Sequence, residues 1–168
     1  MPLPERFKPL PMFGHNSCFG CGSDNAAGLH MKFYSDGRSV ASSLTVPDRL
    51  CGWPQVAHGG IVATILDEIM GWTAIYLMKK VVLTKRLSVD FIKPTPLNEP
   101  LFVQGWVTEQ PDARHVVIHS EIQTPDQAIS AKGEGLFTLF PLDEGVKLGL
   151  FAPELIEALQ TMFLAEQS

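Results

Sequence analysis

Two adjacent carboxylates, Asp67 and Glu68, lie inside an otherwise apolar stretch, VAHGGIVATILDEIMGW, at positions 56–72. Burial of an ionised carboxylate is costly unless the group is paired or neutralised, so a core helix that keeps one has a use for it. Gly59 and Gly60 precede the apolar run, and a glycine turn leaves the first N–H groups of a helix open to an anion or a developing oxyanion. Amide donors that polarise a carbonyl, with a carboxylate that attacks it or activates water, predict acyl hydrolysis.

The spacing of these groups predicts a site shared by two subunits. On a helix, Asp67 lies roughly 10 Å along the axis from Gly60, which is too far for both to contact one carbonyl. Small residues form one stripe with them: Gly60, Ala63, Thr64, Asp67, Gly71 and Ala74. If two such helices pack antiparallel about a two-fold axis, crossing near Ala63 and Thr64, Asp67 of one copy lies beside Gly60 of the other.

These acidic and histidine residues also have structural interpretations. Asp67 could cap a neighbouring loop or pair with Lys85 or Arg86, although the glycine turn favours the catalytic interpretation. Glu68 lies about 100° round the helix from Asp67, and we interpret it as structural. His58 either contacts substrate or holds the loop before the helix.

Composition and charge limit the classes of function. The 168 residues, 45% of them hydrophobic, suit one domain with a sizeable core. A formal net charge of −5, with no Lys/Arg cluster longer than a pair, argues against nucleic acid or a membrane surface as partner. The N-terminal segment has prolines and charges but no signal-peptide core, and no run reaches transmembrane length. We therefore expect a cytoplasmic protein that needs no cofactor.

The three cysteines give no disulfide framework. Cys18 and Cys21 form a CxxC pair that could be half of a zinc site, but a full ligand set would require His15 and His30 to fold back onto it. We favour a turn with two semi-buried thiols and predict no metal site.

The predicted elements describe an α+β domain. Residues 1–28 form an irregular leader, 29–145 the main domain and 146–168 a C-terminal extension with an amphipathic helix. Within the main domain, a hairpin surrounds Asp36-Gly37, a loop covers 47–57, and one long helix runs from Gly59-Gly60 to Lys79-Lys80. Four strands then follow as an antiparallel meander, near 83–91, 101–107, 116–122 and 131–139. A sheet of about six strands must wrap around the helix to bury it, and its open edges imply a second copy.

Three segments, HGGIVATILDE, LTKRLSVDFIKPTPL and KGEGLFTLF, together resemble the hotdog-fold acyl-CoA thioesterases, including the phenylacetate-pathway type. The leader block CFGCGSDNAAGLHMKF is similar to a common N-terminal block of one branch. The resemblance covers about residues 17–141, and the spacing from HGG to Asp67 is its most specific part.

This resemblance implies a homodimer, or a dimer of dimers, that binds acyl-CoA at the subunit interface and hydrolyses an acyl or aryl thioester. Asp67 then serves as nucleophile or general base, and the amide of Gly59 or Gly60 polarises the thioester carbonyl. It also implies that the Thr84 hydroxyl helps to orient water or the acid. Strand alternation, however, places Thr84 on the polar face with Arg86, away from Leu87.

The chain departs from the family before the glycine turn. Relatives commonly place a Gln or Asn where this chain has Cys51, and Gln55, four residues later, is a candidate substitute. We also expect His58 to contact substrate. The CoA phosphates require cations, for which the candidates are Lys85, Arg86, Lys93 and Arg114. Because this amide is missing, a non-catalytic acyl-CoA-binding protein is an alternative to the thioesterase. A hotdog dehydratase is a third alternative.

Overall fold

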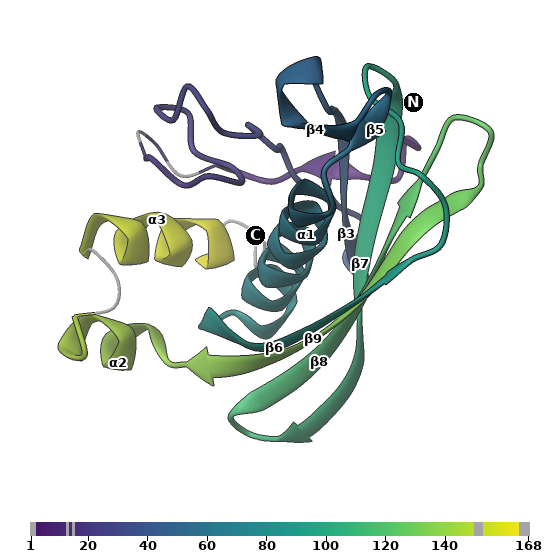
Figure 1. Ribbon diagram of the computed structural model, residues 1–168. Coiled ribbons are helices and arrows are strands. Elements are labelled where there is room, and N and C mark those ends of the chain that lie inside the picture. Colours follow the sequence, from purple (N-terminus) through teal and green to yellow (C-terminus); the bar gives the residue numbers. More distant parts are fainter. Residues whose placement is uncertain (1–2, 13, 15, 150–152, 165–168) are drawn as a thin grey trace.

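The long predicted helix is α1, Gly59–Met78, and a curved sheet wraps around it (Figure 1). The computed structural model describes residues 3–12, 14, 16–149 and 153–164. The side chain of His58 caps the start of α1, and Lys79, in the left-handed conformation, ends it. The buried face of α1 includes residues with no exposed surface, namely Ile65, Leu66, Ile69 and Met70. Apolar burial on one side therefore holds this helix against the sheet.

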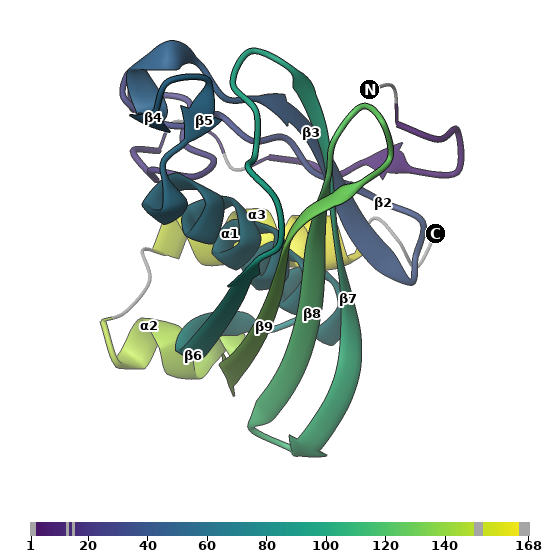
Figure 2. The ribbon, with the colours of Figure 1, turned by 45° about the vertical axis from the view of Figure 1, so that its right-hand side comes forward.

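The main sheet has seven strands in the order β1-β2-β3-β7-β8-β9-β6, all paired antiparallel. Its strands are β1 (Lys8–Pro9), β2 (Tyr34–Ser35), β3 (Ser39–Thr45), β6 (Val81–Phe91), β7 (Pro100–Asp112), β8 (His115–Gln123) and β9 (Ile129–Phe140). Figure 2 shows β6, β9, β8 and β7 side by side in that order beneath α1. The predicted hairpin around Asp36-Gly37 is β2 and β3, with Gly37 at φ 82°.

One part of the predicted strand order is wrong. The four long strands do not form a simple meander, because β6 pairs with β9 and not with β7, the strand that follows it. The proline-rich connection at 92–99 is too long for a tight hairpin, so the chain can cross from one side of β9 to the far side of β8. As a result β6 is an edge strand, and its Leu83 and Phe91 are exposed.

Segments expected to be irregular contain short elements. The loop at 47–57 holds η1 (Asp48–Leu50) and a two-stranded sheet of β4 (Cys51–Trp53) and β5 (Val56–Ala57). The leader adds β1 to the edge of the main sheet and contributes buried Phe7 and Leu10. The leader is therefore packed onto the main domain along part of its length.

Two helices follow the last strand. The six-residue α2, Leu142–Lys147, was not predicted because it is short and contains Gly145. The predicted amphipathic helix is α3, Pro153–Leu164, and its buried side chains are Ile156, Leu159, Met162 and Phe163. The docked C-terminal helix is thus confirmed (Figure 1).

A β-bulge changes the side-chain alternation along β6. Thr84 pairs with Phe137 and Arg86 pairs with Leu136, so Lys85 is an extra residue without a cross-strand partner. An inserted residue reverses the faces of all residues that follow it. Thr84 therefore shares the helix-facing side with Leu87, and its expected position on the outward polar face is wrong.

Helix α1 also has the length and mean hydropathy, 1.5, of a membrane span. The expectation that no segment reaches that length is therefore wrong by these two measures. A core helix satisfies the same criteria, because a helix that is enclosed by a sheet needs a similarly apolar surface. By length and composition alone, this property is weak support for a membrane span.

The docking of α3 gives a first prediction. Leu159 is 1% exposed, so Leu159→Ala should lower the free energy of unfolding by about 2–5 kcal/mol in urea denaturation. The exposed neighbour Gln160 is the control, and Gln160→Ala should change it by less than about 0.5 kcal/mol. Equal effects of the two changes would contradict the docked position of α3.

Candidate active site

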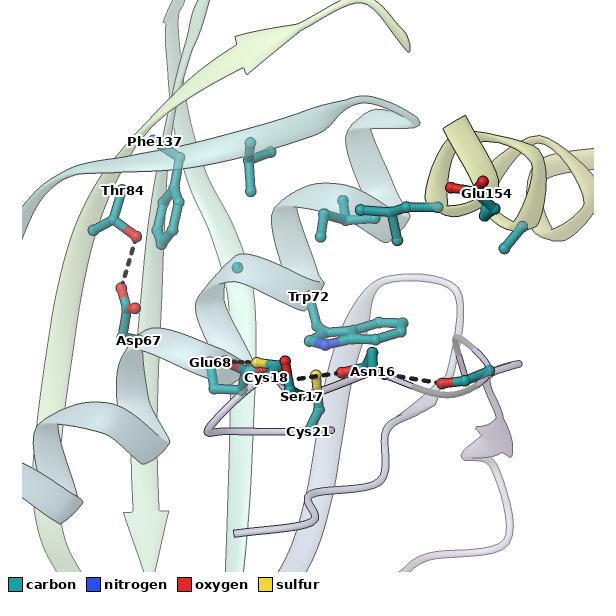
Figure 3. A pocket seen from close by; sticks show the side chains of 16 residues that line it. Asn16, Ser17, Cys18, Cys21, Asp67, Glu68, Trp72, Thr84, Phe137 and Glu154 are labelled. Carbon is teal, nitrogen blue, oxygen red and sulfur yellow. Dashed lines mark hydrogen bonds between the residues drawn. The ribbon is translucent and has the colours of Figure 1, made fainter. Parts of the chain in front are cut away.

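Asp67 and Thr84, two residues predicted to take part in catalysis, are hydrogen-bonded to each other. Thr84 Oγ1 donates to Asp67 Oδ1 over 2.9 Å, from edge strand β6 to the middle of α1 (Figure 3). The bulge at Lys85 makes this contact possible, because it places Thr84 on the side of β6 that faces the helix. Asp67 is only partly buried, so its carboxylate is accessible as well as oriented.

The environment of Asp67 makes this carboxyl group more basic. Burial raises the pKa of Asp67 above its usual value, and the hydrogen bond from Thr84 lowers it in part. A carboxylate with a raised pKa is a better proton acceptor, as a general base requires. The raised pKa of Asp67 also means that the folded state loses stability as pH rises through the titration of this group.

A cavity of about 850 Å³ adjoins the Asp67 carboxylate. Thr84 and Phe137 lie at one end of it, and Trp72 lies deeper along α1 (Figure 3). Helix α3 contributes Glu154 to the opposite wall. The described residues that line it are Gly14, Asn16, Ser17, Cys18, Cys21, Asp67, Glu68, Gly71, Trp72, Ile75, Val82, Thr84, Phe137, Glu154, Leu155 and Ala158. Its size is in the range of small-molecule sites.

The start of α1 presents one of the two predicted amide donors. The Gly60 N–H donates to His58 Nδ1 over 2.9 Å, so this amide already has an acceptor. Among the described residues, no hydrogen-bond acceptor is found for the Gly59 N–H. Gly59 is therefore the better candidate for an oxyanion donor, and His58 holds the loop, one of the two roles considered for it. Within one chain these amides lie about two helical turns from Asp67.

The basic residues expected to bind CoA lie away from the cavity. Lys85 Nζ is 3.3 Å from His115 Nε2, and Arg86 Nη2 is 3.6 Å from Glu134 Oε1. Both contacts are on the sheet face opposite α1, as the alternating burial of β8 and β9 shows. Lys93 lies beside a separate shallow cavity of about 310 Å³. The structure therefore brings none of these three cations to Asp67 within one chain.

The segment before α1 is exposed at both positions of interest. Cys51 lies on β4, and Gln55 adopts a left-handed conformation, φ 66°, in the turn between β4 and β5. The Gln55 carbonyl accepts from the Leu97 N–H over 3.3 Å, which fixes the turn. Neither side chain lines the large cavity in this chain.

A second polar cluster on the cavity wall was not predicted. Glu68, interpreted as structural, lies with Cys18 and Cys21 of the leader, with their ligating atoms within 4.8 Å of one another (Figure 3). Burial raises the pKa of Glu68 to about 7, while a hydrogen bond from Cys21 is the main cause that lowers the pKa of Cys18 to about 5. The CxxC pair is visible in the sequence, but its position against α1 depends on tertiary packing.

Known proteins share part of this sequence. Residues 54–128 match the family model of the thioesterase superfamily. Acyl-coenzyme A thioesterase THEM4 of Rattus norvegicus is 32% identical over 78 residues, which are 46% of this chain and 33% of the relative. The matched part is thus only about a third of the length of this curated relative.

Solved structures agree with the sequence match. A crystal structure of a thioesterase superfamily protein is 33% identical, with a TM-score of 0.64, and the match covers 71% of this chain and 58% of that one. A hypothetical thioesterase of Streptococcus pneumoniae, solved with coenzyme A, is 21% identical, with a TM-score of 0.58 over 62% of this chain and 80% of that one. At that identity the likeness shows the fold alone.

The fold defined by α1 and its enclosing antiparallel sheet is the hotdog fold. With the family match, this places residues 54–128 in the thioesterase superfamily. The resemblance inferred from the HGG turn and Asp67 is therefore confirmed.

The hydrogen bond between Asp67 and Thr84 gives a second prediction. Thr84→Val keeps the volume but removes the donor that lowers the pKa of Asp67, so this pKa should rise further. Carboxyl carbon NMR titration of Asp67 measures the shift. Thr84→Ser keeps the hydroxyl and should leave the pKa near wild type. An unchanged pKa in Thr84→Val would show that the hydrogen bond does not set it.

Proposed function

We propose that this protein is an acyl-CoA thioesterase that hydrolyses the thioester of an acyl- or aryl-CoA. The observation that carries the proposal is the Asp67 carboxylate, which is oriented by Thr84 at the wall of a large cavity. Membership of the matched segment in the thioesterase superfamily supports the same reaction class. Asp67 would attack the thioester carbonyl or remove a proton from the water that does so, giving a carboxylic acid and the CoA thiol.

The charge of the cavity supports one orientation of the substrate. Its titratable lining residues include Asp67, Glu68 and Glu154, and no Lys or Arg from the described part of the chain lines it. Phosphate groups would be repelled there, so the acyl group enters the cavity, between Trp72 and Phe137, and the phosphates of CoA stay outside. The name of the 32% identical relative, an acyl-coenzyme A thioesterase, supports a CoA ester as the substrate class.

The proposed site is completed by a second subunit. The Gly59 amide is too far from Asp67 along α1, so the amide from one copy and the carboxylate from the other would form each site. The stripe of small residues on α1 is only partly buried as far as Gly71, which supports close approach of a second helix. Exposed apolar side chains at the β6 edge, Leu83, Phe91 and Ile92, support the same homodimer, and two dimers could associate further.

A non-catalytic acyl-CoA-binding protein is the second candidate, since Cys51 stands where relatives have an amide. A thiol reagent measures release of the CoA thiol from a panel of aliphatic and aromatic CoA esters. This measurement distinguishes the thioesterase from the binding protein. Hydrolysis of at least one class supports the enzyme. Tight binding of CoA esters that all remain intact would contradict it.

Removal of the Asp67 charge gives a third prediction. Asp67→Asn should reduce kcat by about 10²-fold or more, because the base or nucleophile is lost. Thermal stability should stay near wild type, because a partly desolvated carboxylate is removed without leaving a buried charge unpaired. The exposed Asp90 on β6 is the matched control, and Asp90→Asn should retain activity. Equal activity of wild type and Asp67→Asn would exclude this mechanism.

A complementation experiment tests the shared site. In Gly60→Val the new side chain would crowd the helix start that presents the neighbouring Gly59 amide, because even a Cβ would lie 3.1 Å from His58 Nδ1. Each variant alone should be nearly inactive. In randomly mixed dimers of Asp67→Asn and Gly60→Val chains, about a quarter of wild-type activity should return, since half the dimers are mixed and each has one intact site. No recovery in dimers shown to be mixed and folded would place both groups in one subunit.

A further inference from the structure

The CxxC loop of the leader is folded so that both thiols face the same side. The Gly22 N–H donates to the Cys18 carbonyl over 2.9 Å, which closes the turn. A Cβ at Gly22 would lie 2.5 Å from the Cys18 nitrogen, so this closed turn requires glycine there.

A carboxylate from α1 completes a group of three possible ligands. Glu68 Oε1 lies 3.8 Å from Cys18 Sγ, and one ligand atom from each of Cys18, Cys21 and Glu68 falls within 4.8 Å of the others. The close approach depends on Gly20, because a Cβ there would lie 2.4 Å from the Glu68 carboxyl carbon.

The 3.8 Å between Cys18 Sγ and Glu68 Oε1 is close to the spacing of two ligands on one ion. With bonds of roughly 2.3 Å to sulfur and 2.0–2.2 Å to oxygen, ligands at tetrahedral angles lie roughly 3.3–3.8 Å apart. Two thiolates and one carboxylate suit a borderline-soft divalent ion such as Zn²⁺ and not Mg²⁺ or Ca²⁺, which prefer oxygen ligands. His30 is not part of the set, since its Nδ1 contacts the Gly22 carbonyl, and His15 lies outside the described residues.

We propose that Cys18, Cys21 and Glu68 form a binding site for one thiophilic divalent metal ion, such as Zn²⁺, on the wall of the cavity. Binding releases the thiol protons to solvent, and a water molecule occupies the fourth ligand position on the cavity side. The ion joins the leader to α1 one residue from Asp67. The site thus fixes the cavity wall formed by the leader, independently of the hydrolysis proposed for Asp67.

The direct test uses the reduced full-length protein with Co²⁺ as a spectroscopic probe. Wild type should bind one equivalent with thiolate-to-cobalt charge-transfer absorption and the visible bands of a tetrahedral ion, and Zn²⁺ should displace it. Cys51→Ser is the matched control, because Cys51 is an exposed thiol that lies outside the cavity lining, and it should behave as wild type. Cys18→Ser and Cys21→Ser should lose the charge-transfer absorption, and Glu68→Gln should weaken binding by about tenfold or more.

A second measurement needs no substitution and so does not depend on the folding of a variant. In reduced wild type, Zn²⁺ should protect Cys18 and Cys21 from alkylation, read by peptide mass spectrometry, while Cys51 stays reactive as the internal control. Lack of protection, lack of a charge-transfer band, or a band that survives Cys18→Ser would each overturn the proposal. A Cys18–Cys21 disulfide that persists under reducing conditions would also overturn it. Because neither measurement uses a thioester, failure here is distinguishable from failure of the proposed hydrolysis.

Discussion

The packing of α1 against the sheet fixes the rest of this structure. Leu66, Ile69 and Met70 have no exposed surface and lie within about 100° of one another around the helix. The intervening Asp67 and Glu68 must then lie on the other side, where the sheet does not cover them. The hydrophobic effect, which has no direction of its own, thereby places two carboxylates beside a cavity. The same burial that stabilises the fold selects the position of the candidate chemistry.

The two carboxylates have different surroundings although they are adjacent in sequence. Asp67 accepts a hydrogen bond from Thr84, a neutral hydroxyl that orients it, and no cation among the described residues pairs with its charge. Glu68 lies against two thiols of the leader, a segment remote in sequence. Within this one turn of α1, Asp67 lies on the part of the cavity wall formed with β6, and Glu68 lies on the part formed with the leader. Helix geometry alone separates these two environments.

Local patterns in the sequence were sufficient for the helix but not for all its contacts. The glycine turn and the paired lysines predicted α1 to within a residue or two, and Asp67 followed from the small-residue stripe. The face of β6 on which Thr84 lies was not predictable from strand alternation, because no residue type in the sequence marks the bulge at Lys85. Likewise the pairing of β6 with β9 depends on long-range packing. The hydrogen bond from the Gly60 N–H to His58 and the contact of Glu68 with the leader could not be predicted either, because both depend on where side chains lie in the folded structure.

The extra residue in β6 has a consequence for how this strand can change over time. Before Lys85 the even-numbered residues of β6 face the helix, and after Lys85 the odd-numbered residues do. Loss of that one residue would force one half to rotate, exchanging either Thr84 or Leu87 with an outward-facing neighbour. A single-codon deletion there would therefore be far more disruptive than most substitutions in the same strand. The bulge determines which residues of β6 face the site. An alignment of related sequences should therefore place any gap in this strand at the bulge.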